Sequence, residues 1–246
     1  MGAGLFAAAS PSLALGAPIA YEGFGYAAGF LDGNNGGSGF SGAWSATQGA
    51  RVTSGLTHPS ALPGTGGGAW STIGGAGTRS LPDFTGSSFW VSFLYDANGA
   101  TAPSGSLKVA GNGPESLSFA ASASTIDIAG NTFSGPSFGF SLARPATGTS
   151  LVVLQYVSGT GTVNAWVNPD AASPGAPQGT GHWGGLGTGL RGLDLDLSSL
   201  PIWDEIRIGT TRGDVMQVPG VGGAWLFGLG GAAGLRRQRR RCTISA

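Results

Sequence analysis

Hydrophobic and polar residues alternate over short runs in the body of this chain, residues 21–214, with no convincing helical period. In residues 88–95 (SFWVSFLY) both alternating faces are apolar, which is typical of a strand buried in the middle of a sandwich. A second buried run is LVVLQYV at 151–157. Shorter runs, separated by Gly, Pro or Asn, lie at 107–110, 116–120, 125–128, 138–142, 162–167, 193–197 and 202–209. Regular short strands with turn signals predict an all-β fold, a sandwich or a barrel.

Glycine supports this prediction, since 48 of the 246 residues are Gly, against a usual share of roughly 7%. Each interior Gly costs a helix about 1 kcal/mol relative to Ala, so a helical fold is disfavoured. Gly and Pro show no triplet period, which excludes collagen. Seven Trp, twelve Phe and four Tyr argue against a disordered chain. In the body, glycine gathers in turn clusters such as 32–38 and 63–68.

The C-terminal segment, residues 215–246, differs from the body. No charge occurs from 215 to 235, and Trp225 is among the large apolar residues of VPGVGGAWLFGLGGAAGL at 218–235. About 20 apolar residues span a bilayer as a helix, and Lys and Arg favour its cytoplasmic side. We therefore expect a hydrophobic anchor helix with a cytoplasmic arginine tail; the alternative is a disordered Gly-rich tail. The tail contains Arg236, Arg237, Arg239, Arg240 and Arg241.

Residues 1–20 are similar to a secretory signal peptide. LFAAASPSLAL at 5–15 has the length of a signal-peptide apolar region, and small residues follow it. No Lys or Arg precedes Arg51, so we expect the true start to lie upstream of Met1. Cys242 is the one cysteine, which excludes a disulfide framework and a Cys-based metal site.

The net charge of zero is the sum of two unlike parts. Before the arginine tail there are seven basic residues and all twelve acidic ones, so the body carries a net charge of −5. An acidic body repels phosphate backbones, and nucleic acid is therefore not an expected partner. These signals together predict an exported body with its C-terminal tail in the membrane.

The carboxylates suggest one possible active site. Asp194 and Asp196 alternate in LDLDL and so share one face of a strand, which could serve glycoside hydrolysis. The simpler interpretation is a strand with its acids in water and its leucines in the core, and we favour it. Asp204 and Glu205 are adjacent, so they are predicted to face opposite ways, with one pointing inward or sideways and paired with an arginine or backbone amides.

Metal and cofactor signals are weak. His58 and His182 are far apart and lack zinc-ligand spacing. Asp32, Asn34 and Asn35 offer oxygen donors of the kind that calcium takes, but no EF-hand spacing is present and a plain turn explains them. No metal site and no cofactor are predicted. Calcium binding is compatible with the sequence, but no sequence feature supports it.

Tryptophan suggests a carbohydrate ligand, because sugars stack on aromatic faces. Trp44, Trp70 and Trp183 lie in Gly-rich, loop-like sequence and are candidate stacking residues, although core packing is at least as common a role. Trp90 and Trp166 lie in predicted strands and are expected in the core.

Several segments resemble a family. YEGFGYAAG at 21–29 and LDGNNGGSGFSGAW at 31–44 resemble the opening of bacterial secreted proteins with a LamG-like, concanavalin A-type jelly roll. SFWVSFLY at 88–95, WVNPD at 166–170 and WDEIRIGTT at 203–211 resemble later landmarks of that group. The resemblance covers most of the chain and implies one jelly-roll domain over residues 21–214. Asn168 and Asp170, in the WVNPD landmark, join the carbohydrate-binding candidates.

Members of this group often end in a PEP-CTERM signal, which is a Pro-Glu-Pro motif, an apolar helix and an arginine cluster. The resemblance implies recognition by an exosortase-like enzyme, cleavage near the motif, and delivery to the cell surface or exopolysaccharide matrix. This chain has the helix and the arginines, but Val218-Pro219-Gly220 stands in place of the motif, without its glutamate and second proline.

The same jelly roll houses laminarinase-type hydrolases, whose catalytic strand resembles E-I-D-I-E. Here Glu205 matches the nucleophile, whereas Arg207 and Gly209 stand at the helper and acid/base positions. Retaining hydrolysis needs two carboxylates, and this strand supplies one. We therefore expect an exported, non-catalytic protein of the surface or matrix, structural or glycan-binding. The alternative is a secreted glycan hydrolase using Asp194, Asp196 or Glu205.

Overall fold

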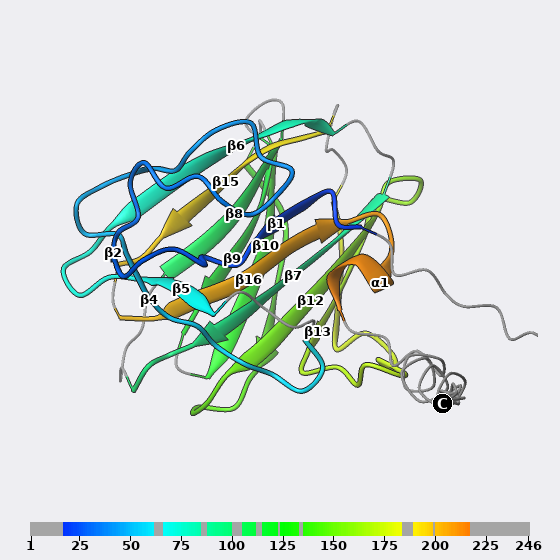
Figure 1. The fold of residues 1–246 in the computed structure, drawn as a ribbon. Helices are drawn as coiled ribbons and strands as arrows, with labels where there is room; N and C mark the ends of the chain where they lie inside the picture. Colours follow the sequence, from blue (N-terminus) through cyan, green and yellow to red (C-terminus); the bar gives the residue numbers. More distant parts are fainter. Residues whose placement is uncertain are drawn as a thin grey trace, which may run out of the picture. The chain divides into compact units, whose positions relative to one another are not determined.

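The computed structural model describes residues 17–61, 66–84, 88–99, 105–111, 115–122, 124–132, 135–183, 189–198 and 200–216. These residues form two antiparallel sheets packed face to face (Figure 1). The predictions for residues 1–16 and for the tail, including Val218, Pro219, Trp225 and the terminal arginines, lie outside the described residues. No helix within the described ranges has the length and apolar character needed to cross a bilayer.

In the described chain, one sheet has nine strands, in the order β14-β13-β12-β7-β16-β5-β4-β2, with β1 paired to β16. It is called the nine-stranded sheet below. Its strands are β1 (Ala20–Glu22), β2 (Gly29–Phe30), β4 (Arg51–Ser54), β5 (Gly67–Trp70), β7 (Ser88–Asp96), β12 (Ser150–Val157), β13 (Thr162–Val167), β14 (Gly179–His182) and β16 (Ile202–Gly209).

The second sheet has seven strands within the described residues, in the order β11-β10-β9-β8-β15-β6-β3, and is called the seven-stranded sheet. Its strands are β3 (Ser45–Ala46), β6 (Ala76–Phe84), β8 (Gly105–Gly111), β9 (Ser116–Ala121), β10 (Thr125–Thr132), β11 (Gly135–Ala143) and β15 (Leu190–Asp196). A short helix, α1 (Arg212–Val215), follows β16.

The predicted all-β, two-sheet antiparallel sandwich is confirmed, and a strand lies at every run that the alternation predicted. The sequence pattern did not predict β1 to β6, β14 or α1. The longest of these, β6, reads AGTRSLPDF, and its polar and small residues hide the period of two. The predicted C-terminal helix lies outside the described residues.

The main core lies between the two sheets. Phe93 of β7 contacts Phe119 of β9 edge-on across the interface, with ring centroids 5.0 Å apart. On the other side of Phe93, Trp203 of β16 has its centroid at 5.2 Å. Aromatic pairs of this kind contribute about 0.5–1.5 kcal/mol beyond their buried area. Packing among these rings therefore helps to hold the centres of the two sheets together.

A second apolar cluster covers part of the outer face of the nine-stranded sheet. Leu94 of β7, Leu151 and Val153 of β12 and Trp166 of β13 are buried there beneath Val215 of α1. Ala171 and Met216 are also buried in this cluster, and Leu56, Ala61 and Trp90 pack against it. Ser92 of β7 donates a hydrogen bond of 2.5 Å to the Val215 carbonyl, which helps to hold α1 against the sheet.

Two glycines let the loop between β2 and β3 lie directly against β1. Gly37 has φ of +68°, and a Cβ atom there would lie 2.1 Å from the Tyr21 carbonyl oxygen. Gly39 has φ of +77°, and its Cβ would lie 1.8 Å from the Ile19 carbonyl oxygen. Only glycine combines this backbone region with so close an approach.

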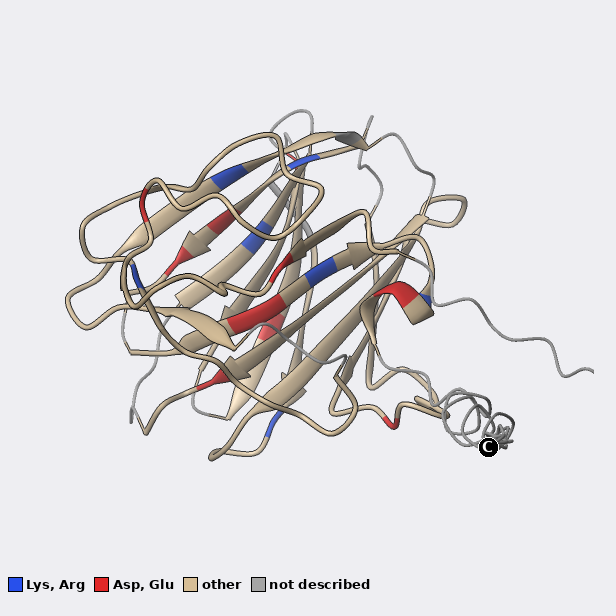
Figure 2. Cartoon of the chain, viewed as in Figure 1, with Lys and Arg blue, Asp and Glu red and all other residues tan. Residues whose placement is uncertain are grey.

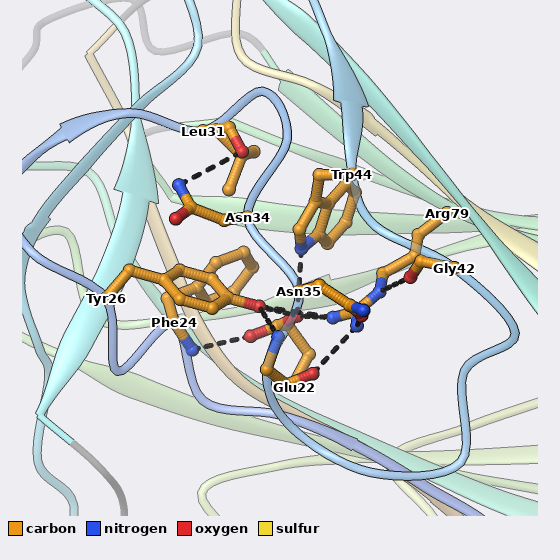
Figure 3. Close-up of polar contacts among 10 residues, drawn as sticks. Glu22, Phe24, Tyr26, Leu31, Asn34, Asn35, Gly42, Trp44 and Arg79 are labelled. Atoms are coloured by element: carbon orange, nitrogen blue, oxygen red, sulfur yellow. Dashed lines mark hydrogen bonds and ion pairs between the residues drawn. The ribbon is translucent and has the colours of Figure 1, made fainter.

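A buried ion pair connects the two sheets at this end (Figure 3). Glu22 lies in β1 of the nine-stranded sheet and Arg79 in β6 of the seven-stranded sheet, and each side chain is 1% exposed. The Glu22 carboxylate also accepts hydrogen bonds from the Tyr26 hydroxyl at 2.9 Å and the Trp44 indole N–H at 2.8 Å. The Phe24 amide donates to its other oxygen at 2.7 Å.

The remaining donors of Arg79 hold the loop. Its Nη2 donates to the Asn35 side-chain oxygen at 3.0 Å and the Gly36 carbonyl at 2.7 Å. Its Nε donates to the Gly42 carbonyl at 2.9 Å. A buried charge is tolerated when it is paired and its hydrogen-bonding groups are satisfied, and this network meets that condition.

Replacing Arg79 with Met is expected to lower the free energy of unfolding by about 3–5 kcal/mol, because Glu22 is then buried without its counter-ion. Urea unfolding of the chain at neutral pH measures the change. Lys108→Met, at an exposed position of β8, is the matched control and should change stability by less than about 0.5 kcal/mol. Equal effects of the two substitutions would contradict the clamping role of Arg79.

Candidate functional site

Two of the tryptophans proposed to stack on sugars lie in the core. Trp44 is 2% exposed, donates its N–H to Glu22 and packs against Phe24 with centroids 5.8 Å apart. Trp183 is fully buried and donates to the Asn131 carbonyl at 3.3 Å. Neither ring presents a face to solvent, so both have the core role that the sequence left open.

The other three candidates lie at the surface but not in one place. Trp70 is half-buried at the end of β5. Asn168 accepts a hydrogen bond of 2.8 Å from the Leu151 amide, and Asp170 accepts one of 2.7 Å from the Ala172 amide. Asn168 therefore joins the end of β13 to the start of β12, and turn formation accounts for Asp170. Their assignment as ligand-binding residues remains a prediction.

The carboxylates of the predicted hydrolase alternative are distributed over both sheets. Asp194 and Asp196 lie on the outer face of β15 in the seven-stranded sheet, with Leu193 and Leu195 in the core. Glu205 lies in β16 of the nine-stranded sheet. The simpler interpretation of LDLDL is therefore correct. The structure does not bring these three acids together in one cleft.

Residues Asp204 and Glu205 do not face opposite ways, and that prediction is wrong. The register between β16 and β7 shifts between Asp204 and Arg207, and Glu205 has a φ of +51°. Trp203 and Ile206, on either side, both point into the core. The bulge therefore places both acids on the outer side of the sheet, which strict alternation does not allow.

The partners expected for these acids are present. Glu205 pairs with Arg207 at 2.7 Å and accepts a hydrogen bond of 3.0 Å from the Tyr21 hydroxyl. Asp204 accepts hydrogen bonds of 2.7 Å from the Leu56 and Glu205 backbone amides. Burial raises the pKa of Asp204 to about 7, although these two amides act in the opposite direction. Asp204 therefore holds the Leu56 segment, and Glu205 is held by Arg207 and Tyr21.

The loop with calcium-type donors uses them internally. The Asp32 carboxylate accepts from the Ala46 amide at 2.8 Å, and the Asn34 amide donates to the Phe30 carbonyl at 2.7 Å. Asn35 accepts from Arg79, a cation that competes with a metal. Among the residues that the structure describes, no three His, Cys, Asp or Glu side chains are grouped as metal ligands.

A shallow cavity of about 180 Å³ lies beside the Glu22–Arg79 pair. Ligand pockets usually enclose about 300–1,000 Å³, so this space is small for an organic ligand. The Tyr26 hydroxyl at its wall is already bonded to Glu22. The cavity is lined by Tyr21, Gly23, Gly25, Tyr26, Asn35, Gly36 and Gly37.

The open part of the outer face of the nine-stranded sheet, near β14, carries a row of polar side chains. Register places Trp90 beside Gln155, Gln155 beside Asn164, and Asn164 beside Thr180. Their chain neighbours Phe89, Tyr156 and Val163 are in the core, so the row faces outward. We call Trp90, Gln155, Asn164 and Thr180 the amide row.

Hydrogen bonds order the amide row. Asn164 donates to the Gln155 oxygen at 3.3 Å and accepts from the Thr180 hydroxyl at 3.1 Å. Trp90 stacks on Trp166, with centroids 5.7 Å apart and planes inclined by 16°. Trp90, Gln155 and Asn164 are half-buried and Thr180 is exposed. A held aromatic ring beside amide and hydroxyl groups matches the alternating apolar faces and hydroxyls of a sugar.

Glycines in β14 allow this strand to pack closely on the other sheet. Cβ atoms at Gly179 and Gly181 would lie 2.4 Å from the rings of Phe140 and Phe138, respectively. The phenylalanines of the other sheet therefore occupy the inward side of β14. The outward positions of this strand carry Thr180 and His182, both exposed.

Sequence reasoning missed this row because it treated Trp90 as a core residue alone, whereas Trp90 packs against the second apolar cluster and is only half-buried. The signal was present in the second alternating face of the runs at 88–95, 151–157 and 162–167. That face is covered at Leu94 and Val153 but not at Gln155 and Asn164. The hydrophobic pattern of a single strand does not show at which residue the apolar cluster that covers its outer face ends.

Comparison with known proteins gave partial structural likenesses. No family model matches the chain. No curated protein matches it in sequence. The CBM2 module of the evolved Dit of Lactobacillus casei BL23 phage J-1 is 14% identical, covers 72% of this chain and 92% of its own, and gives a TM-score of 0.43. A Caenorhabditis elegans galectin is 12% identical over 54% and 89% of the two chains, with a TM-score of 0.38.

A botulinum neurotoxin type C structure, described for its interaction with two ganglioside molecules, is 10% identical with a TM-score of 0.44. The match covers 70% of this chain and 44% of the toxin chain, so this chain corresponds to less than half of it.

The raised pKa of Asp204 makes a contribution to stability that depends on pH. The folded chain holds this proton up to about pH 7, whereas the ordinary value is 3.8. The stabilisation is therefore complete below about pH 4 and is lost as the pH rises through 7. Between pH 4 and 8, we expect the wild type to lose up to about 4 kcal/mol of unfolding free energy relative to Asp204→Asn.

Urea unfolding at several pH values measures this difference. A loss of stability that Asp204→Asn causes equally at every pH shifts its curve by a constant and leaves the slope with pH unchanged. Asp127→Asn, at an exposed position of β10, is the control and should remain parallel to the wild type. Parallel curves for wild type and Asp204→Asn would show that Asp204 titrates normally.

Proposed function

We propose that this chain is an exported, non-catalytic glycan-binding protein of the cell surface or exopolysaccharide matrix, and that it binds glycan through the amide row. The observation that carries the proposal is the combination of Trp90, Gln155, Asn164 and Thr180 on an open sheet face. No enzymatic role is proposed, because Asp194 and Asp196 lie on a different sheet from Glu205, and Glu205 is paired with Arg207.

Preorganisation supports binding at this row. Trp90 is fixed by its stack on Trp166, so little rotamer entropy is lost when a sugar packs against it. The Gln155 amide accepts from Asn164 and has two N–H donors of its own. Sugar hydroxyls can both donate and accept, so they complement such amides in more than one orientation. The geometry therefore suits extended glycans rather than one enclosed small molecule.

The predicted terminal segments support the location. A signal-like N-terminus and an apolar stretch followed by arginines are the features of an exported chain with a membrane-retained tail. Processing by an exosortase-like enzyme is part of this proposal, with Val218-Pro219-Gly220 at the expected motif.

Gln155→Ala is expected to weaken glycan binding about ten-fold, because it removes a hydrogen-bonding group from the open face. A glycan array identifies ligands, and calorimetry then compares affinities with calcium and with a chelator. Gln48→Ala, at an exposed turn position between β3 and β4, is the matched control. Trp90→Phe, which keeps an aromatic ring, should weaken binding less than Trp90→Ala.

Absence of binding across a broad polysaccharide panel would contradict the glycan-binding proposal and leave a structural matrix role. Equal binding by Gln155→Ala and wild type would place the ligand elsewhere on the chain. Thermal unfolding of each variant separates loss of the site from loss of the fold.

A fusion with a C-terminal reporter tests the location. We expect the body to be outside the cell, with the arginine tail either cytoplasmic or removed, because arginine favours the cytoplasmic side. Protease protection and fractionation measure both positions. A soluble cytoplasmic chain with an intact tail would contradict export.

A further inference from the structure

A second row of outward side chains lies at the opposite end of the nine-stranded sheet. Register places Phe30 of β2 beside Arg51 of β4, and Arg51 beside Trp70 of β5. The residues Leu31, Val52 and Ala69, which alternate with them, are buried in the core. Phe30, Arg51 and Trp70 therefore share the outer face, and we call them the arginine row.

The arginine row is open and ordered. Phe30 is 53% exposed, and the Arg51 guanidinium carbon lies 4.5 Å from the centroid of its ring. Arg51 and Trp70 are half-buried. A cation held over an aromatic face has a restricted orientation, so its N–H donors are directed before any ligand arrives.

Arg51 differs from the buried arginines in its partners. Arg79 is paired with Glu22 and Arg207 with Glu205. No Asp or Glu in the described part of the chain forms an ion pair with Arg51. Charged residues are few and scattered over both sheets (Figure 2). A cation that stacks on an aromatic ring but has no carboxylate partner among the described residues is therefore a local site for an anion.

We propose that the arginine row binds the carboxylate-bearing sugars of an acidic polysaccharide. The Arg51 guanidinium donates two parallel N–H bonds to the sugar carboxylate, and the face of Trp70 contacts its ring. The inference deepens the proposed glycan-binding function by naming a uronate as the ligand class. It places this ligand on strands separate from those of the amide row.

Polygalacturonate and its carboxyl-reduced, neutral polymer are the matched probes. Wild-type chain should bind polygalacturonate more tightly, and salt should reduce the difference. Arg51→Gln should weaken polygalacturonate binding about ten-fold or more and leave the neutral polymer unaffected. Arg51→Lys should restore only part of the affinity, because lysine lacks the planar fork. Lys108→Gln, at an exposed position of the other sheet, is the control.

Equal affinity for the two polymers, or an Arg51→Gln variant that binds polygalacturonate like wild type, would overturn the proposal. Preference for single-stranded DNA over polygalacturonate would overturn it too, since any polyanion would then suffice. Concentration-dependent self-association that is lost in Arg51→Gln would assign the row to a second copy of the chain instead. Gln155→Ala tests glycan binding at the amide row independently of Arg51. Failure of the arginine row can therefore be told apart from failure of the proposed function.

Discussion

The ion pair between Glu22 and Arg79 is the constraint on which this end of the sandwich depends. The two residues belong to different sheets and share a buried environment, so removing either leaves an uncompensated charge in the interior. The same guanidinium fixes the loop that contains Asn35 and Gly42, and the same carboxylate fixes Trp44. A polar network in which every group has a partner fixes one arrangement of the loop and the two sheets. An apolar contact, which is not directional, would fix that arrangement less precisely.

The outer face of the nine-stranded sheet has a covered middle and two uncovered ends. In the middle, Asp204 holds the Leu56 segment and Ser92 holds the end of α1, so the apolar residues beneath them are buried. Toward β14 and toward β2 this cover is replaced by the amide row and the arginine row. Function is proposed where this cover ends, whereas Glu205, which matches the nucleophile of the catalytic strand, is paired with Arg207 and Tyr21.

The sequence predicted the sandwich and its longer strands because alternation is a local property of each strand. LDLDL shows this well, since its leucines are buried and its acids are outside. The sites depend on properties that one strand does not contain. The bulge at Glu205 requires a positive φ, and a glutamate in the sequence does not indicate one. The row Phe30–Arg51–Trp70 depends on the register of three strands that the alternation did not predict. Trp44 has a loop-like sequence context, but a carboxylate 22 positions earlier draws it into the core.

The strand order has a further consequence for a polymeric ligand. Four strand steps separate β4, with Arg51, from β12, with Gln155, which corresponds to about 20 Å at 4.7–4.9 Å per step. Two weak contacts at that spacing on one rigid sheet raise each other's effective concentration when a single chain spans them. If two different polysaccharide chains occupy them instead, the same sheet becomes a cross-link, and the spacing of the strands sets the distance between the two chains.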